Sequence, residues 1–140
     1  MAPGKKHEDH DHIVARQERY IAVWRTGSSE KLMEFMHKQD FTLSNFGNRV
    51  EGLSHSAAKE QFEHGFKNFH DLDIQTRSLH GHKHFTAWEW VMTCKTAVDA
   101  DGKKLSQAEA PSNKLVGCTL AWWDDDDKIV KSHEYYQALD

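Results

Sequence analysis

The chain has 140 residues, of which 38% are hydrophobic and 29% are charged, and its formal net charge is -4. This length fits one domain that can bury a core without disulfide or metal support. Lysines and arginines are scattered, so the sequence lacks the basic stripe of a nucleic-acid binder. It also has no apolar run of the roughly 20 residues that span a bilayer, and no apolar stretch follows the charged N-terminus. We therefore expect a soluble, cytoplasmic protein with neither nucleic acid nor membrane as a partner.

Residues 1–12 are rich in histidine and acidic residues. We interpret them as a flexible, solvated tail in front of a single domain over residues 13–140. The two cysteines, Cys94 and Cys118, fall in strand-like segments of a sequence without a secretory signal. We expect both to be reduced and buried.

The first half of the domain is expected to be mainly helical. Apolar residues at helical spacing predict a helix over 13–25, which ends at Thr26-Gly27. Ser28 or Ser29 caps a second, short helix that forms a hairpin with the first. A strand over 40–46 and a third helix from Ser54 or Ser56 to about residue 69 follow. The glycine inside this third helix, Gly65, suggests close packing at that point.

The second half is expected to be almost entirely strand. Four runs rich in branched and aromatic residues cover 72–80, 84–98, 114–123 and 128–138. Their connections suit antiparallel hairpins. Helices followed by an antiparallel meander predict an α+β domain, with three helices on the concave side of a curved sheet.

Two polar runs lie between the predicted strands. The histidines of HGHKH at 80–84 could present metal ligands, but Gly81 marks a turn that spreads them around a hairpin tip. The aspartates at 124–127 lack the spaced ligands of a calcium loop and are interpreted as a charged tip. We expect no metal and no cofactor.

The last predicted strand, KIVKSHEYYQ, contains one carboxylate among apolar and aromatic residues. Because side chains alternate along a strand, Glu134 shares a face with Ser132 and Tyr136. Small and polar groups among hydrophobic ones are typical of a polar-lined cavity. The alternative is an edge strand with Glu134 in water.

The order of helices and strands resembles the nuclear transport factor 2-like superfamily, and within it the SnoaL-like polyketide cyclases. The resemblance is carried by ERYIAVWRTGSSEKLMEFM, QDFTLSNFG, HFTAWEWVMTCKT and KLVGCTLAWWDDDDKIVKSHEYY, and it extends from about residue 13 almost to the end. It implies a cone-shaped, cystatin-like roll that encloses one deep apolar pocket. Related proteins include ketosteroid isomerase, limonene epoxide hydrolase and members without chemistry, so the fold does not fix the reaction.

The resemblance also implies roles for single residues. Tyr20 matches the tyrosine that donates to the enolate in ketosteroid isomerase, but Asn45 replaces the aspartate base of that enzyme and Thr119 its protonated aspartate. In limonene epoxide hydrolase, Asn45 matches an asparagine that holds water and Glu134 an aspartate that activates it. Leu43 departs from a tyrosine of that enzyme, and its bridging arginine is missing.

A second carboxylate, Glu89, lies between two tryptophans in FTAWEWVM. If it faces inward, the two glutamates repel each other, and the pair splits into an acid and a base. Otherwise Glu89 lies exposed on the outer face of the sheet. In the first case we expect Glu134, Glu89, Asn45 and Tyr20 to be catalytic.

Aromatic residues are also abundant enough to form an outer surface. Trp88, Trp90, Leu120 and Trp122, with His133 and Tyr135, would be costly to leave in water on one sheet face. We expect a homodimer through that face, which the resemblance also implies. The alternative assigns the tryptophans to the pocket.

Three functions remain open from the sequence, of which the third is an interaction protein that uses the aromatic surface and has its pocket filled by side chains. The first is a cofactor-independent enzyme of the isomerase, cyclase, dehydratase or hydrolase type, which acts on a small apolar organic molecule by general acid/base chemistry. The second is a binding protein with the same pocket and no turnover. For either of the first two functions we expect the pocket to be lined by Trp24, Phe41, Leu43, Phe62, Phe66, Thr119, Ser132 and Tyr136.

Overall fold

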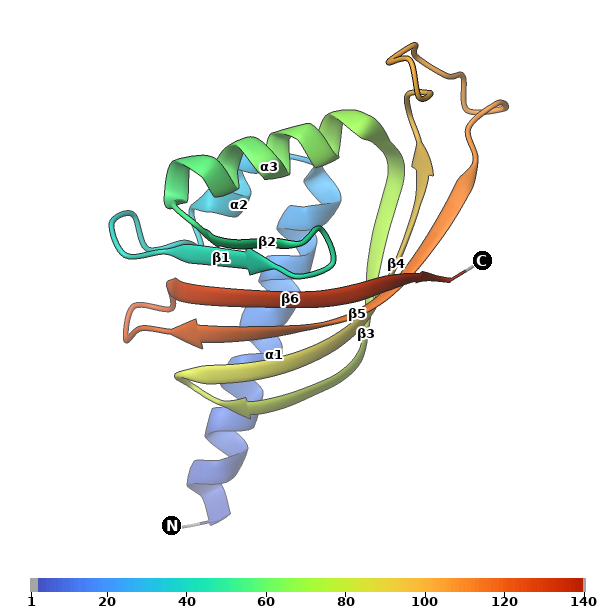
Figure 1. Ribbon diagram of the computed structural model, residues 1–140. Coiled ribbons are helices and arrows are strands. Elements are labelled where there is room, and N and C mark those ends of the chain that lie inside the picture. The colour runs from blue at the N-terminus through green and yellow to red at the C-terminus, as the bar shows by residue number, and fades with distance from the viewer. Residues whose placement is uncertain (1–2, 140) are drawn as a thin grey trace.

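The computed structural model describes the backbone of residues 3–139 and the side chains of residues 9–139. Three helices accompany one curved, mainly antiparallel sheet that does not close into a barrel (Figure 1). The helices are α1 (Pro3–Thr26), α2 (Ser29–Met33) and α3 (His55–Asn68), and the strands are β1 (Thr42–Asn45), β2 (Val50–Leu53), β3 (Phe69–His82), β4 (Phe85–Thr96), β5 (Ser112–Trp123) and β6 (Ile129–Leu139). The predicted α+β class is confirmed.

The strand order is β2-β1-β6-β5-β4-β3. Strands β3 to β6 form the predicted antiparallel meander, whereas β1 pairs with β6 in parallel. The β1–β6 register places Asn45 beside Glu134, and the Phe46 amide donates to the Glu134 carbonyl over 2.8 Å. Two polar residues far apart in the sequence are thereby held next to each other.

The helix starts follow the predicted caps. The Ser28 side chain accepts a hydrogen bond from the Lys31 amide, and the Ser54 side chain accepts one from the Ala57 amide. Strand β2 was not predicted, because four residues with an internal glycine carry too little pattern. No helix among the described residues is long and apolar enough to cross a membrane.

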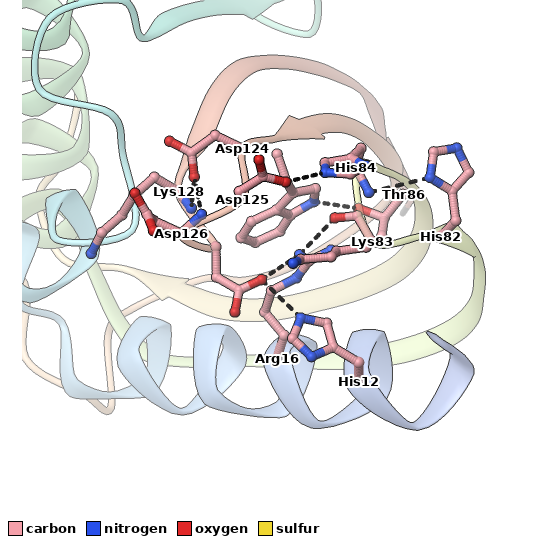
Figure 2. Close-up of polar contacts among 12 residues, drawn as sticks. His12, Arg16, His82, Lys83, His84, Thr86, Asp124, Asp125, Asp126 and Lys128 are labelled. Carbon is pink, nitrogen blue, oxygen red and sulfur yellow. Dashed lines mark hydrogen bonds and ion pairs between the residues drawn. The ribbon is translucent and has the colours of Figure 1, made fainter. Parts of the chain in front are cut away.

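Helix α1 begins at Pro3, ten residues before its predicted start. The expected tail over residues 1–12 is therefore helical from Pro3, while residues 1 and 2 lie outside the described residues. Long-range contacts hold this part of the helix to the turn between β5 and β6 (Figure 2). His12 Nε2 and Arg16 Nη1 each lie 2.8 Å from Asp127 Oδ1. Arg16 is 1% exposed and stacks on the Trp123 ring.

The two predicted hairpin tips meet beside this part of α1. Arg16 Nη1 donates to the Lys83 carbonyl over 2.8 Å, and His84 Nε2 lies 2.7 Å from Asp125 Oδ1 (Figure 2). The first of these contacts is to a backbone carbonyl and the second pairs one imidazole with one carboxylate. Within residues 9–139 no group of three or more His, Cys, Asp or Glu side chains is arranged to hold a metal.

The core lies between the helices and the inner face of the sheet. Trp88 and Trp90 are 4% and 3% exposed, so the prediction that they form the outer surface is wrong. The alternation places them inward, where Trp88 contacts Tyr20 edge to face. Trp122 faces outward and carries the Lys131 ammonium 4.2 Å above its ring.

The expected close packing at Gly65 is also wrong. A Cβ at Gly65 would meet no atom within 4 Å, and the backbone there is helical. Because alanine is a better helix former, Gly65→Ala is expected to raise the free energy of unfolding by roughly 0.5–1 kcal/mol. Urea denaturation measures the change. An equal or lower stability would show that a methyl group at this position does meet a neighbour.

Candidate functional site

One cavity lies between α1, α3 and the inner face of the sheet, with a volume of about 460 Å³. Its wall is mostly apolar, with polar groups from β1, α3 and β6. The lining residues are Trp24, Asn45, Asn48, Gln61, Phe62, His64, Gly65, Phe66, Asn68, Phe69, Leu72, Trp90, Met92, Leu115, Glu134 and Tyr136. No lysine or arginine is among these described residues, so the cavity offers no permanently positive side chain to an anionic ligand.

Aromatic rings form two sides of this cavity. On the helical side, Trp24 contacts Phe62 and Phe66 edge to face, with ring centroids 5.6 and 5.3 Å apart. On the sheet side, Trp90 and Tyr136 lie with their ring centroids 6.1 Å apart. Large flat rings on both sides suit an apolar ligand with conjugated or ring-shaped parts.

Glycines allow the two rings on the sheet side to lie close to the backbone. A Cβ at Gly117 would overlap the Trp90 indole, and a Cβ at Gly47 would overlap the Tyr136 ring. Each ring therefore occupies the space of a missing side chain. The volume of the cavity depends on both glycines.

Glu134 contributes the only carboxylate of this lining. No described residue donates a hydrogen bond to this carboxylate or forms an ion pair with it. Burial without a compensating partner raises the pKa of Glu134 from 4.5 to about 7. At neutral pH the group can therefore both take up and release a proton.

A short turn after β1 brings polar groups next to Glu134. Asn45 is 6% exposed, and its Oδ1 accepts a hydrogen bond from the Asn48 amide over 3.1 Å. Burial raises the pKa of Tyr136, hydrogen bonding from Asn45 and Asn48 opposes the rise, and the charge of Glu134 adds to it. Asn45, Glu134 and Tyr136 are thus brought together at one wall of the cavity.

Of the other residues expected at the site, Trp24, Phe62 and Phe66 line the cavity, and five do not. These five are core residues: Tyr20, Phe41, Leu43, Thr119 and Ser132 are between 0% and 7% exposed. Tyr20 and Thr119 border only a void of about 10 Å³, too small for a substrate. Thr119 Oγ1 instead accepts a hydrogen bond from Trp90 Nε1 over 2.9 Å.

Glu89 lies on the opposite face of the sheet from the cavity. It is exposed, and Ser78 Oγ lies 3.4 Å from its Oε1. The inward turn of Trp88 and Trp90 forces this placement, because neighbouring side chains on a strand alternate. The expected pairing of Glu89 with Glu134 in one pocket is wrong.

The polar rim of the cavity was not predicted from the sequence. Gln61, His64, Gly65 and Asn68 follow the helical spacing i, i+3, i+4 and i+7, and all four line the cavity. His64 Nε2 lies 2.7 Å from Asn68 Nδ2. A polar stripe beside the phenylalanines of α3 was the available signal, since a helix packed entirely into a core would not carry it.

A second, open groove of about 840 Å³ lies between α2 and the turn after β5. Its lining includes Glu30, Lys38 and Asp126, all of which are exposed. These charged side chains lie in water, whereas the Glu134 carboxylate of the first cavity is half-buried, so the first cavity is the better candidate site.

The comparisons with known proteins agree with the fold. The model of the SnoaL-like domain family matches residues 17–132, and the chain belongs to this family, which has the nuclear transport factor 2-like fold. Cyclase aurE from Calcarisporium arbuscula is 27% identical over 125 residues, which cover 89% of this chain and 87% of that protein.

Two solved structures show the same architecture at lower identity. A structure of AclR from Streptomyces galilaeus, described as a putative hydroxylase, has a TM-score of 0.72 and 15% identity, covering 88% of this chain and 86% of the other. The epoxide hydrolase/cyclase-like enzyme SalBIII, which is linked to pyran ring formation in salinomycin, has a TM-score of 0.70 and 14% identity, covering 92% and 93%. These likenesses show that the fold is shared.

Proposed function

We propose that this protein is a cofactor-independent, cyclase-type enzyme that uses Glu134 as a general acid/base on an uncharged, largely apolar organic molecule. The observation that carries the proposal is the half-buried Glu134 carboxylate, which lines an aromatic cavity and has no hydrogen-bond or ion-pair partner among the described residues. Its burial raises the pKa of Glu134 to about 7. The similarity to cyclase aurE supports the reaction class. The free thiols of Cys94 and Cys118 support a cytoplasmic location.

The lining of the cavity determines which substrates are favoured. A negatively charged molecule would meet the charge of Glu134 and no described lysine or arginine in the wall. A neutral ketone, lactone or epoxide would place its apolar part between Trp24, Phe66 and Trp90. Its polar part would then lie beside Glu134 and Asn45, where proton transfer can open, close or shift a bond.

To test for catalysis, the protein is incubated with neutral ketones, lactones and epoxides in deuterated buffer. The compounds are then analysed by mass spectrometry. Deuterium on carbon, a cyclised product or an opened epoxide supports the proposal. Compounds that bind, as shown by tryptophan fluorescence, but come back unchanged would indicate the binding protein without turnover instead.

We further propose a homodimer through the outer face of the sheet. The exposed aromatic residues there are Phe46 and Tyr135, which are 36% and 44% exposed and stack with ring centroids 4.9 Å apart. Trp122 and His133 adjoin them, with ring centroids 5.0 Å apart. Sedimentation at micromolar concentration is expected to give twice the mass of one chain. Tyr135→Glu should shift the protein to a monomer, and a wild-type monomer would contradict the dimer.

A further inference from the structure

The ring of Tyr136 is fixed at its hydroxyl end. A Cβ at Gly47 would overlap the Cζ atom of Tyr136, which carries the hydroxyl group, as well as both neighbouring ring carbons. The phenol oxygen therefore lies against the turn that follows β1. That turn is itself closed by hydrogen bonds from the Asn48 amide to the Asn45 carbonyl (3.2 Å) and from the Arg49 amide to the Phe46 carbonyl (3.3 Å).

The same turn determines which groups face the phenol oxygen. Because Oδ1 of Asn45 already accepts from the Asn48 amide over 3.1 Å, the free end of the Asn45 side chain is its amide nitrogen, a donor. Hydrogen bonding from Asn45 and from the Asn48 side chain favours a negative charge on the Tyr136 oxygen, as donors to that oxygen do. Among the described residues no hydrogen bond uses the hydroxyl proton of Tyr136, and Tyr136 lines the cavity, so this proton is left for a ligand there.

Tyr136 and Glu134 are two residues apart on β6 and both line the cavity. Two positions along a strand correspond to about 7 Å between Cα atoms, so both side chains can reach neighbouring atoms of one small molecule. Tyr20, by contrast, is 5% exposed, contacts Phe35 and Trp88 edge to face, and does not line the cavity.

We propose that Tyr136, and not Tyr20, donates the hydrogen bond to the substrate oxygen next to the atom that Glu134 deprotonates. Asn45, Gly47 and Asn48 act as positioning residues for its hydroxyl group. This inference rests on the proposed function, since it names the second group of the same site. It also names the substrate class as a neutral carbonyl compound with a C–H bond beside the carbonyl.

The proton transfer balances without any further reactant. The Glu134 carboxylate takes the proton from the carbon, the C–H electron pair forms the new C=C bond, and the carbonyl π pair moves to the oxygen. Tyr136 stabilises this oxygen by a hydrogen bond while retaining its own proton. Return of the proton from Glu134 to carbon, or attack of the enolate on an electrophilic carbon of the same molecule, completes an isomerisation or a ring closure.

The test uses 4-nitrophenolate, a flat oxyanion whose absorbance reports its surroundings, and the Glu134→Gln background, which removes the repelling carboxylate. In alkaline buffer we expect this background to bind the probe and to shift its absorbance. Adding Tyr136→Phe should weaken binding about 10- to 100-fold, because a hydrogen bond to a charged oxygen is lost. Adding Tyr135→Phe, which changes the neighbouring exposed tyrosine, should leave the affinity unchanged.

Gly47→Ala in the same background tests the positioning role. Its methyl group displaces the Tyr136 ring, so the affinity should fall in the same direction as with Tyr136→Phe, while circular dichroism reports whether the fold persists. Unchanged affinity with Tyr136→Phe, or a loss with Tyr20→Phe instead, would overturn the assignment. This experiment measures binding in a variant without the base. The assignment of Tyr136 as the donor can therefore be confirmed or refuted whether or not the wild-type protein turns over a substrate.

Discussion

In the deuterium and product assays, the Glu134→Gln variant is expected to react about 100- to 10,000-fold more slowly than the wild-type protein. Glutamine keeps the size of the side chain but cannot take up a proton. The cavity and its aromatic walls remain, so ligand binding measured by tryptophan fluorescence should persist. The loss should therefore appear in kcat, with KM little changed.

The matched control for this loss is Glu89→Gln. Glu89 lies on β4 and is exposed on the face of the sheet opposite the cavity. Its replacement should leave the rate within about twofold of the wild-type rate. The wild-type rate should also rise with pH and level off above about pH 7, because Glu134 acts as a base only when ionised. A near-normal rate in Glu134→Gln would remove this residue from the mechanism.

The same carboxylate should make the stability of the protein depend on pH. Between pH 4.5 and about pH 7 the unfolded chain ionises Glu134, whereas the folded protein keeps it protonated. The folded state then binds more protons, so the free energy of unfolding falls as pH rises through this window. A pKa raised from 4.5 to about 7 corresponds to a loss of about 3 kcal/mol above pH 7.

Denaturation with urea at about pH 4 and about pH 8 measures this effect. Glu134→Gln carries no charge to desolvate, so it should match the wild-type stability at the lower pH. At the higher pH it should exceed the wild type by about 3 kcal/mol. Glu89→Gln controls for removal of a carboxylate as such. A pH-independent difference between Glu134→Gln and the wild type would mean that the carboxylate is solvated in the folded protein.

The sequence predicted the elements better than the surfaces they present. The caps at Ser28 and Ser54 and the four long strands follow local patterns, because capping and branched-residue content act over a few residues. The inward direction of Trp88 and Trp90 did not follow, since that strand carries large side chains on both faces. The helical segment before Ile13 was missed because its contact with Asp127 is over a hundred positions away.

The candidate site was predicted only in part, because local patterns act over a few residues. Period-two alternation placed Glu134 with Tyr136, and both line the cavity. Local sequence cannot separate a core residue such as Leu43 from a cavity residue such as Phe66, because both are apolar at suitable spacing. The difference depends on where the folded chain leaves space, and that space is bounded by residues far apart in the sequence.

The parallel pairing of β1 with β6 has a kinetic consequence. Strand β6 lies between β1 and β5, although β1 precedes it by about ninety positions, so this pairing closes a very long loop and should form slowly. Until β6 is in place, β1 and β5 present unpaired edges to other chains. Refolding at high protein concentration should therefore lose material to aggregation before the cavity exists, and dilution should recover it.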